Sequence, residues 1–126
     1  MYLDPPYWKQ AEGQYSPDPT DLANMPLEAF TETLAELIKQ YAEKLKRGRA
    51  SAHIALLLQP TQWNAPDHRY TDHILDVVGR VNLPVAMRIS CPYDTSQVTP
   101  QMVEVAKAQR TVLVLTRELV IWEVAP

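Results

Sequence analysis

Glycine and cysteine are scarce in this chain of 126 residues, which contains three glycines and one cysteine. Gly13, Gly48 and Gly79 lie far apart, so the chain cannot build a glycine-rich loop whose backbone amides close on a phosphate or a dinucleotide. This excludes P-loop enzymes and proteins with the dinucleotide-binding fingerprint. Cys91 has no second cysteine to pair with, and the lack of an intrachain disulfide is usual in a reducing cytoplasm.

Long apolar runs and an excess of basic residues are absent as well. No apolar stretch approaches the roughly 20 residues that a membrane-spanning helix needs. The N-terminal residues lack the basic region and apolar core of a secretory signal. The net charge of −3 argues against nucleic-acid binding through a general positive field, although a local basic patch remains compatible with it. We therefore expect a cytoplasmic protein without membrane contact.

Apolar spacing predicts one globular domain, residues 1–126, in which strands and helices alternate. The expected elements are a strand end at 1–3, a loop over 9–26, a helix over 27–47, a strand over 52–58, a helix over 71–81, a strand over 83–90, a helix from Thr99 to about Arg110, and two β-rich runs at 112–115 and 119–122. The continuous apolar run 52–58 is typical of a strand covered on both faces. This order predicts an α/β fold with a mostly parallel sheet, flanking helices and a C-terminal β-hairpin or bent antiparallel strand.

Three loops are expected to meet at one edge of this sheet. They are residues 4–8, 59–63 and 90–93, and each follows a predicted strand. Each loop combines proline, a hydrogen-bonding side chain and an aromatic ring. Because ligands of such folds bind outside the carboxyl ends of the strands, the sequence predicts a ligand crevice formed by these loops.

The first of these loops begins with Asp4-Pro5-Pro6-Tyr7, directly after the apolar strand end. This string resembles the catalytic motif of the DNA amino-methyltransferases, which methylate adenine N6 or cytosine N4 with S-adenosylmethionine. The lone pair of an exocyclic amino group is delocalised into the ring, so the catalyst must hold the amino hydrogens and leave the lone pair free. The resemblance implies that Asp4 and the Pro5 carbonyl accept those hydrogens, while Pro5 and Pro6 stiffen the loop.

The same resemblance implies that Tyr7 stacks on a target base flipped out of the duplex, because a base inside the stack cannot be reached. Aspartate at the first motif position favours adenine N6 as the target. The order of helices and strands after the motif is similar to the later half of the Rossmann-like methyltransferase fold, so the likeness covers nearly the whole chain. The implied partner is DNA, as in restriction-modification enzymes.

One part of the family pattern is missing from this chain. The family also carries a glycine-rich motif of the type D-P-F-x-G-x-G, where the backbone approaches the methionine part of S-adenosylmethionine, and nothing here provides it. No complete cofactor site is therefore expected, although Asp4 and Pro5 could contribute to one. The chain looks like a catalytic half that is inactive without a cofactor-binding half, supplied upstream or by another polypeptide.

Further candidates are weaker, and each has a structural alternative. Trp8, Gln62, Trp63 and His68 could contact the flipped base or the DNA from the crevice. The two tryptophans could equally pack into the core, and the segment around His68 could be an exposed loop. No metal site is expected, because no set of histidines, cysteines and acidic residues has ligand spacing.

A non-catalytic alternative stays open beside the enzyme hypothesis. The chain could be a truncated remnant that acts as a self-associating or nucleic-acid-interaction module. An uncovered apolar strand edge pairs readily with another chain, so this alternative predicts a dimer with residues 1–4 near the interface.

Overall fold

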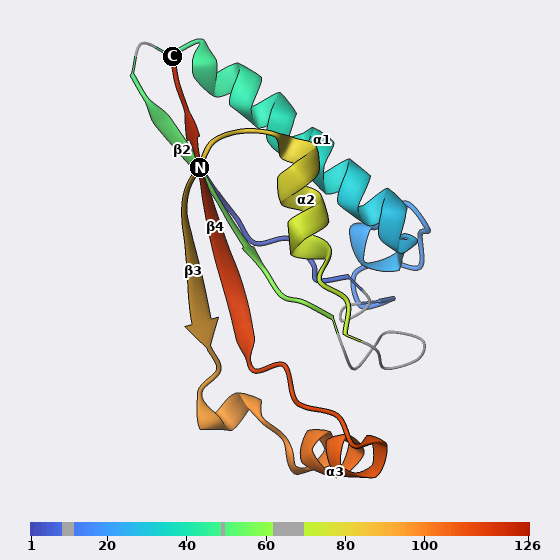
Figure 1. Ribbon diagram of the computed structural model, residues 1–126. Helices are drawn as coiled ribbons and strands as arrows, with labels where there is room; N and C mark the ends of the chain where they lie inside the picture. The colour runs from blue at the N-terminus through green and yellow to red at the C-terminus, as the bar shows by residue number, and fades with distance from the viewer. Residues whose placement is uncertain (9–11, 49, 62–69) are drawn as a thin grey trace.

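The computed structural model of the chain describes residues 1–8, 12–48, 50–61 and 70–126 (Figure 1). Over these residues the protein is an α/β fold with a four-stranded mixed sheet and three α-helices. The elements are, in chain order, β1 (Tyr2–Leu3), the 3-10 helix η1 (Leu22–Asn24), α1 (Leu27–Lys46), β2 (Ala52–Leu58), α2 (His73–Val81), β3 (Val85–Pro92), the 3-10 helix η2 (Thr95–Gln97), α3 (Pro100–Gln109) and β4 (Thr116–Val124).

β4 lies inside the sheet, whose strand order is β1-β2-β4-β3. β1 pairs with β2 in parallel, whereas β4 pairs antiparallel with both β2 and β3. The prediction of a mostly parallel sheet is therefore wrong. β1, β2 and β3 run in the same direction, but the reversed β4 separates β2 from β3 and leaves one parallel pair among the described strands.

The antiparallel strand expected near the C-terminus is confirmed as β4, but it forms no hairpin with residues 112–115. That run lies outside the strands of the sheet. β4 begins at Thr116, which pairs with Pro92 at the end of β3. Just beyond this pair the Tyr93 backbone N–H donates to the Leu115 carbonyl at 2.8 Å. The contact between the two segments therefore extends one residue past the strands, but residues 112–115 form no strand of a hairpin.

The predicted helices are confirmed, with a small correction at one start. Thr99 caps α3 as expected, because its Oγ1 accepts from the Met102 backbone N–H at 3.3 Å. α2 begins at His73, two residues later than the predicted start at 71, and it is capped by Asp72, whose carboxylate accepts from the Ile74 N–H at 3.2 Å. Aspartate is the stronger cap here because its charge also suits the positive end of the helix dipole.

Helices α1 and α2 cover one face of the sheet and enclose the core with it (Figure 1). Inward-facing residues alternate along β2 and β4, as the two-residue period of a strand requires. The core residues without solvent exposure include Phe30 and Ile38 from α1, Ile54, Leu56 and Leu58 from β2, Ile74 and Val77 from α2, and Val120 and Trp122 from β4.

The opposite face of the sheet carries apolar side chains that no described helix covers. Tyr2, Met87 and Ile89 are 61%, 54% and 39% exposed, and Leu57 is only half-buried. α3 lies beyond the end of the sheet instead of covering this face (Figure 1). The prediction that the strand over 52–58 is covered on both faces is therefore wrong. We call these side chains the open face.

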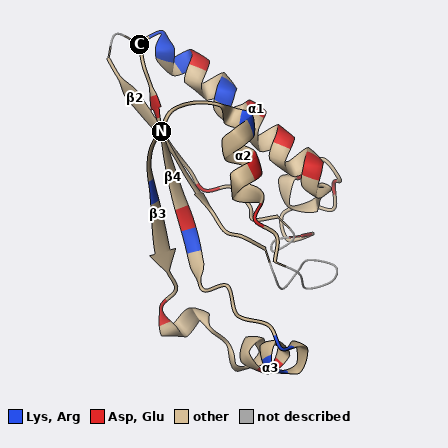
Figure 2. Cartoon of the chain, viewed as in Figure 1, with Lys and Arg blue, Asp and Glu red and all other residues tan. Residues whose placement is uncertain are grey.

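Charged residues of α1 are distributed along its outer side (Figure 2). Glu28 lies in the first turn, and Lys44 and Lys46 lie in the last turn. This order places negative charge at the positive end of the helix dipole and positive charge at the negative end. The outer side of α1 therefore carries mixed charge and no continuous basic stripe.

His73 is a titratable residue within this core. It is 2% exposed, and the rings of Trp8 and Phe30 meet it edge-on at centroid distances of 6.1 and 5.5 Å. Burial among these groups lowers the pKa of His73, and the nearby charges of Asp72 and Asp76 only partly oppose that effect. The imidazole is therefore neutral in the folded protein near pH 7.

Acidification from about pH 7 to about pH 5 is expected to lower the free energy of unfolding through His73. The unfolded chain takes up this proton near the ordinary histidine pKa of 6.5, whereas the folded chain takes it up only at lower pH. The unfolded state therefore binds more protons in this range, and stability falls as the pH decreases. Urea unfolding at the two pH values measures the effect.

Two histidine variants separate the contribution of His73 from the rest of the pH dependence. His73→Phe should lose part of the decrease in stability, whereas the exposed His53, replaced by Gln, should leave it unchanged. An equal pH dependence in His73→Phe and the parent protein would contradict this assignment.

Candidate functional site

Three of the strands end, and the fourth begins, at one edge of the sheet. Leu3 pairs with Leu56 near the end of β2, Leu58 pairs with Glu118, and Pro92 pairs with Thr116. The loops after β1, β2 and β3 therefore leave the sheet at the same edge, as the sequence predicted for residues 4–8, 59–63 and 90–93. The amino end of β4 joins them there, which the sequence did not predict.

Asp4 and Tyr7 contact each other in the first of these loops. The Tyr7 hydroxyl donates to Asp4 Oδ1 at 3.3 Å, and Asp4 is otherwise exposed. Burial of the ring, reinforced by the Asp4 carboxylate, raises the pKa of Tyr7 to about 12. Tyr7 therefore keeps its proton near neutral pH and acts as a hydrogen-bond donor that fixes one oxygen of Asp4, while Oδ2 keeps its lone pairs.

Arg117 joins the first loop to the third. Its guanidinium carbon lies 5.8 Å from the centroid of the Tyr7 ring and 5.5 Å from that of Tyr93. Both distances fall in the range of cation–π attraction. Gln59 begins the second loop and is 7% exposed. Burial raises the pKa of Tyr93, and hydrogen bonds with Arg117 and Gln59 partly oppose this rise. All three loops therefore contribute side chains around Arg117.

Sequence reasoning missed Arg117, although a signal for it exists. Along β4 the buried residues Glu118 and Val120 alternate with partly exposed ones, so Arg117 projects to the face opposite α1 and α2. Arg117 lies at the start of β4, and this position indicates a place in the site only when β4 is known to run antiparallel to its neighbours. The sequence alone did not establish that the start of β4 would lie beside Tyr7.

A pocket of about 280 Å³ opens next to Arg117 on the open face. Leu57 and Leu119 are among its apolar lining residues, Tyr93 contributes an aromatic ring, and Gln97 adds an amide. The volume is close to the lower end of the range for small-molecule sites, ~300–1,000 Å³. Apolar walls with a guanidinium and an amide suit a flat or apolar group that carries a hydrogen-bond acceptor.

Trp8 serves the core instead of the crevice. It is 6% exposed, and its indole N–H donates to the Met25 carbonyl at 2.9 Å. Its own carbonyl accepts from Thr61 Oγ1 at 3.2 Å, which ties the first loop to the second. Of the two roles considered for Trp8, this placement favours packing over contact with a flipped base.

The other predicted contact residues, Gln62, Trp63 and His68, lie outside the described residues, and their roles stay predictions. On either side of them, Thr61 and Thr71 exchange two backbone hydrogen bonds of 3.1 and 2.9 Å. This pair joins the two described segments on either side of residues 62–69. Both threonines lie near the edge of the sheet where β2 ends.

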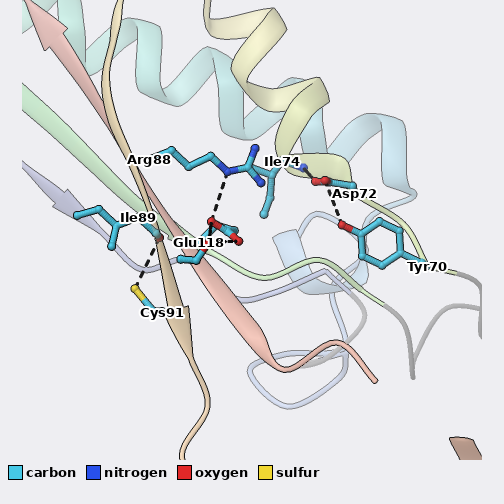
Figure 3. Close-up of polar contacts among 8 residues, drawn as sticks. Tyr70, Asp72, Ile74, Arg88, Ile89, Cys91 and Glu118 are labelled. Atoms are coloured by element: carbon cyan, nitrogen blue, oxygen red, sulfur yellow. Dashed lines mark hydrogen bonds and ion pairs between the residues drawn. The ribbon is translucent and has the colours of Figure 1, made fainter. Parts of the chain in front are cut away.

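Glu118 forms a separate polar cluster on the covered face (Figure 3). It is 8% exposed, and it accepts from Ser90 Oγ at 3.0 and 3.1 Å and from Arg88 Nε at 3.3 Å. The Tyr70 hydroxyl donates to Asp72 nearby at 3.1 Å. Because the charge of Glu118 is paired with Arg88, this cluster connects β3 to β4 and has a structural role.

The three glycines lie in separate places in the described structure. Gly13 and Gly79 have open space where a Cβ would lie, and Gly48 follows α1 close to the Leu45 carbonyl. The prediction that the chain holds no complete site for S-adenosylmethionine stays a prediction.

Among the described residues, no three histidine, cysteine or acidic side chains gather in a way that could hold a metal ion. In the same part of the chain, no helix is long and apolar enough to span a bilayer.

Comparisons of the chain with protein-family models, with curated proteins and with solved structures returned no match.

Proposed function

We propose that this chain is the target-base-binding half of an S-adenosylmethionine-dependent DNA amino-methyltransferase, with adenine N6 as the favoured target. The observation that carries the proposal is the Asp4-Tyr7 pair directly after β1, where the Tyr7 hydroxyl donates to Asp4 Oδ1 at 3.3 Å. The D-P-P-Y motif thus lies at the carboxyl end of a strand, as the family resemblance requires.

In this proposal Asp4 and Pro5 orient the amino group of the flipped base. One amino hydrogen is accepted by Asp4 Oδ2, the oxygen that Tyr7 leaves free, and the other by the Pro5 carbonyl. The nitrogen lone pair then points away from both acceptors. Tyr7 stays protonated, since its pKa is about 12, and its hydroxyl holds one oxygen of the carboxylate through the hydrogen bond to Oδ1. The ring of Tyr7 supplies the stacking surface for the base.

The methyl donor is bound outside this chain in the proposal. The glycines that would approach S-adenosylmethionine are missing, and the open face offers an uncovered apolar surface to a further part of an α/β fold. The chain alone is therefore expected to bind a nucleobase but to transfer no methyl group. Activity should require a polypeptide that supplies the glycine-rich segment.

A nucleoside titration followed by NMR tests base binding on the chain as it stands. Adenosine should shift the backbone amide signals of Asp4 and Tyr7, whereas N6,N6-dimethyladenosine, which has no amino hydrogens, should bind about 10-fold or more weakly. That factor follows from the loss of hydrogen bonds to a charged acceptor. Asp4→Asn should weaken the binding of adenosine. Asp76→Asn, a change at an aspartate of α2, is its control and should not. Equal binding of both nucleosides would contradict the proposal.

The open face favours a second candidate, a self-associating module without catalysis. Tyr2 and Met87 are each more than half exposed on it, and β1 has no described partner on its outer edge. Exposed apolar surface next to a free strand edge promotes association of copies. Analytical ultracentrifugation and the adenosine titration together distinguish the two candidates. The self-associating module requires a dimer that Met87→Lys dissociates, and it requires that adenosine does not bind.

A further inference from the structure

Arg117 is a partly buried cation to which no described acidic residue is paired. Its Nε is buried and has no hydrogen-bond partner among the described residues. Two other arginines of the described residues show the contrast, because each forms an ion pair: Arg88 lies 3.3 Å from Glu118, and Arg80 lies 3.1 Å from Asp76. Arg117 is held instead by the faces of two tyrosine rings.

Such an arrangement orients the guanidinium without neutralising it. The rings of Tyr7 and Tyr93 attract the cation through their faces, and Tyr93 also interacts with Arg117 by a side-chain hydrogen bond. The buried Nε–H of Arg117 has no hydrogen-bond partner among the described residues, and such an unsatisfied donor lowers stability. The residue therefore has the properties of a preformed anion receptor, because a bound anion would supply the missing acceptors.

The neighbours of Arg117 indicate which anion this is. The guanidinium fork matches the geometry of phosphate and carboxylate oxygens. The adjoining pocket adds the Gln97 amide as a further polar group. Tyr7, which carries the target base in the proposed function, lies 5.8 Å from the Arg117 guanidinium carbon. A nucleotide that placed its base at Tyr7 would bring its own phosphate to this side of the crevice.

We infer that Arg117 binds a phosphate group, the one attached to the target nucleotide, and so positions the flipped base against Asp4. This inference rests on the proposed function for the identity of the nucleotide. Arg117 is a binding and positioning residue in this scheme, and it takes no part in the transfer of the methyl group. The same site would prefer adenosine monophosphate to adenosine.

NMR of the whole chain tests the inference through the Arg117 Nε–Hε signal. The probes are adenosine monophosphate, adenosine, inorganic phosphate, and methionine as a carboxylate without phosphate. The variants are Arg117→Met, which keeps the apolar stem, and Arg117→Lys, which keeps the charge. Arg47→Met, a change at an exposed arginine after α1, is the control. Dispersed amide spectra establish that each variant is folded.

The monophosphate is expected to bind about 10-fold or more tightly than adenosine and to shift the Arg117 signal, as for hydrogen bonds between charged partners. Arg117→Met should abolish this preference, Arg117→Lys should retain part of it, and Arg47→Met should retain all of it. A preference that persists in Arg117→Met overturns the inference, and so does binding of methionine in place of phosphate.

The titrations also separate this inference from the proposed function. If the preference for the monophosphate depends on Arg117 while adenosine and N6,N6-dimethyladenosine bind equally, the phosphate site stands and the role of Asp4 fails. If adenosine binding depends on Asp4 while the monophosphate has no Arg117-dependent advantage, the proposed function stands and the phosphate site is refuted.

Discussion

Replacing Asp4 by alanine is expected to lower the rate of methyl transfer by roughly 100-fold to 1,000-fold in the enzyme completed with its cofactor-binding part. Asp4 is the charged acceptor that holds the target amino group in the proposed mechanism, and losses of this size follow removal of one such oriented polar group. The measurement is transfer of a labelled methyl group from S-adenosylmethionine to DNA. Asp4→Asn keeps an acceptor oxygen and should lose less activity.

Variants at Tyr7 and Asp76 establish whether the loss is specific. Tyr7→Phe keeps the stacking surface but removes the 3.3 Å hydrogen bond to Asp4, so it should lower the rate less than Tyr7→Ala. Asp76→Ala removes an aspartate that pairs with Arg80 on α2 and should leave the rate unchanged. Full activity in both Asp4→Ala and Tyr7→Ala would refute the roles assigned to the motif.

Replacing Trp122 by alanine is expected to lower the free energy of unfolding by about 3–5 kcal/mol, the range for deletion of a buried aromatic side chain. Trp122 has no solvent exposure and lies on β4, where it pairs with Ile54 of β2 and Val85 of β3. Because domains are typically stable by only about 5–15 kcal/mol, this change should bring the chain close to unfolding. Urea denaturation followed by circular dichroism measures it.

Two other substitutions calibrate the Trp122 result. Trp122→Phe keeps most of the ring volume and removes an indole N–H that has no hydrogen-bond partner among the described residues, so it should destabilise far less. Tyr2→Ala deletes a large side chain that is 61% exposed and should change stability little. A similar loss for Trp122→Ala and Tyr2→Ala would show that β4 is not the centre of the core.

Much of the fold follows from local patterns in the sequence. The apolar spacing from Leu27 to Leu45 matches α1, the run 52–58 matches β2, and Thr99-Pro100 marks the start of α3. Each of these patterns depends on residues close in sequence, such as a cap or one apolar face. The direction and the place of β4 depend on which distant strands bond to it, so local patterns could not determine them.

The candidate site was predictable to a similar degree. Proline-rich loops after strands correctly indicated that Asp4, Gln59 and Tyr93 lie at one edge of the sheet. The contact of Arg117 with Tyr7 and Tyr93 required knowledge of the antiparallel register. Trp8 shows the opposite case: its position after the motif suggested a base contact, but its indole meets the Met25 carbonyl.

The interior position of β4 has a consequence for synthesis of the chain. β4 follows every other described element in sequence, yet it supplies hydrogen bonds to both β2 and β3. β2 and β3 therefore leave the ribosome before β4 has been synthesised. The backbone N–H and C=O groups on their facing edges stay without hydrogen-bond partners until residues 116–124 emerge. Unpaired edges of this kind favour aggregation, so the formation of β4 is expected to protect the nascent protein against association through those edges.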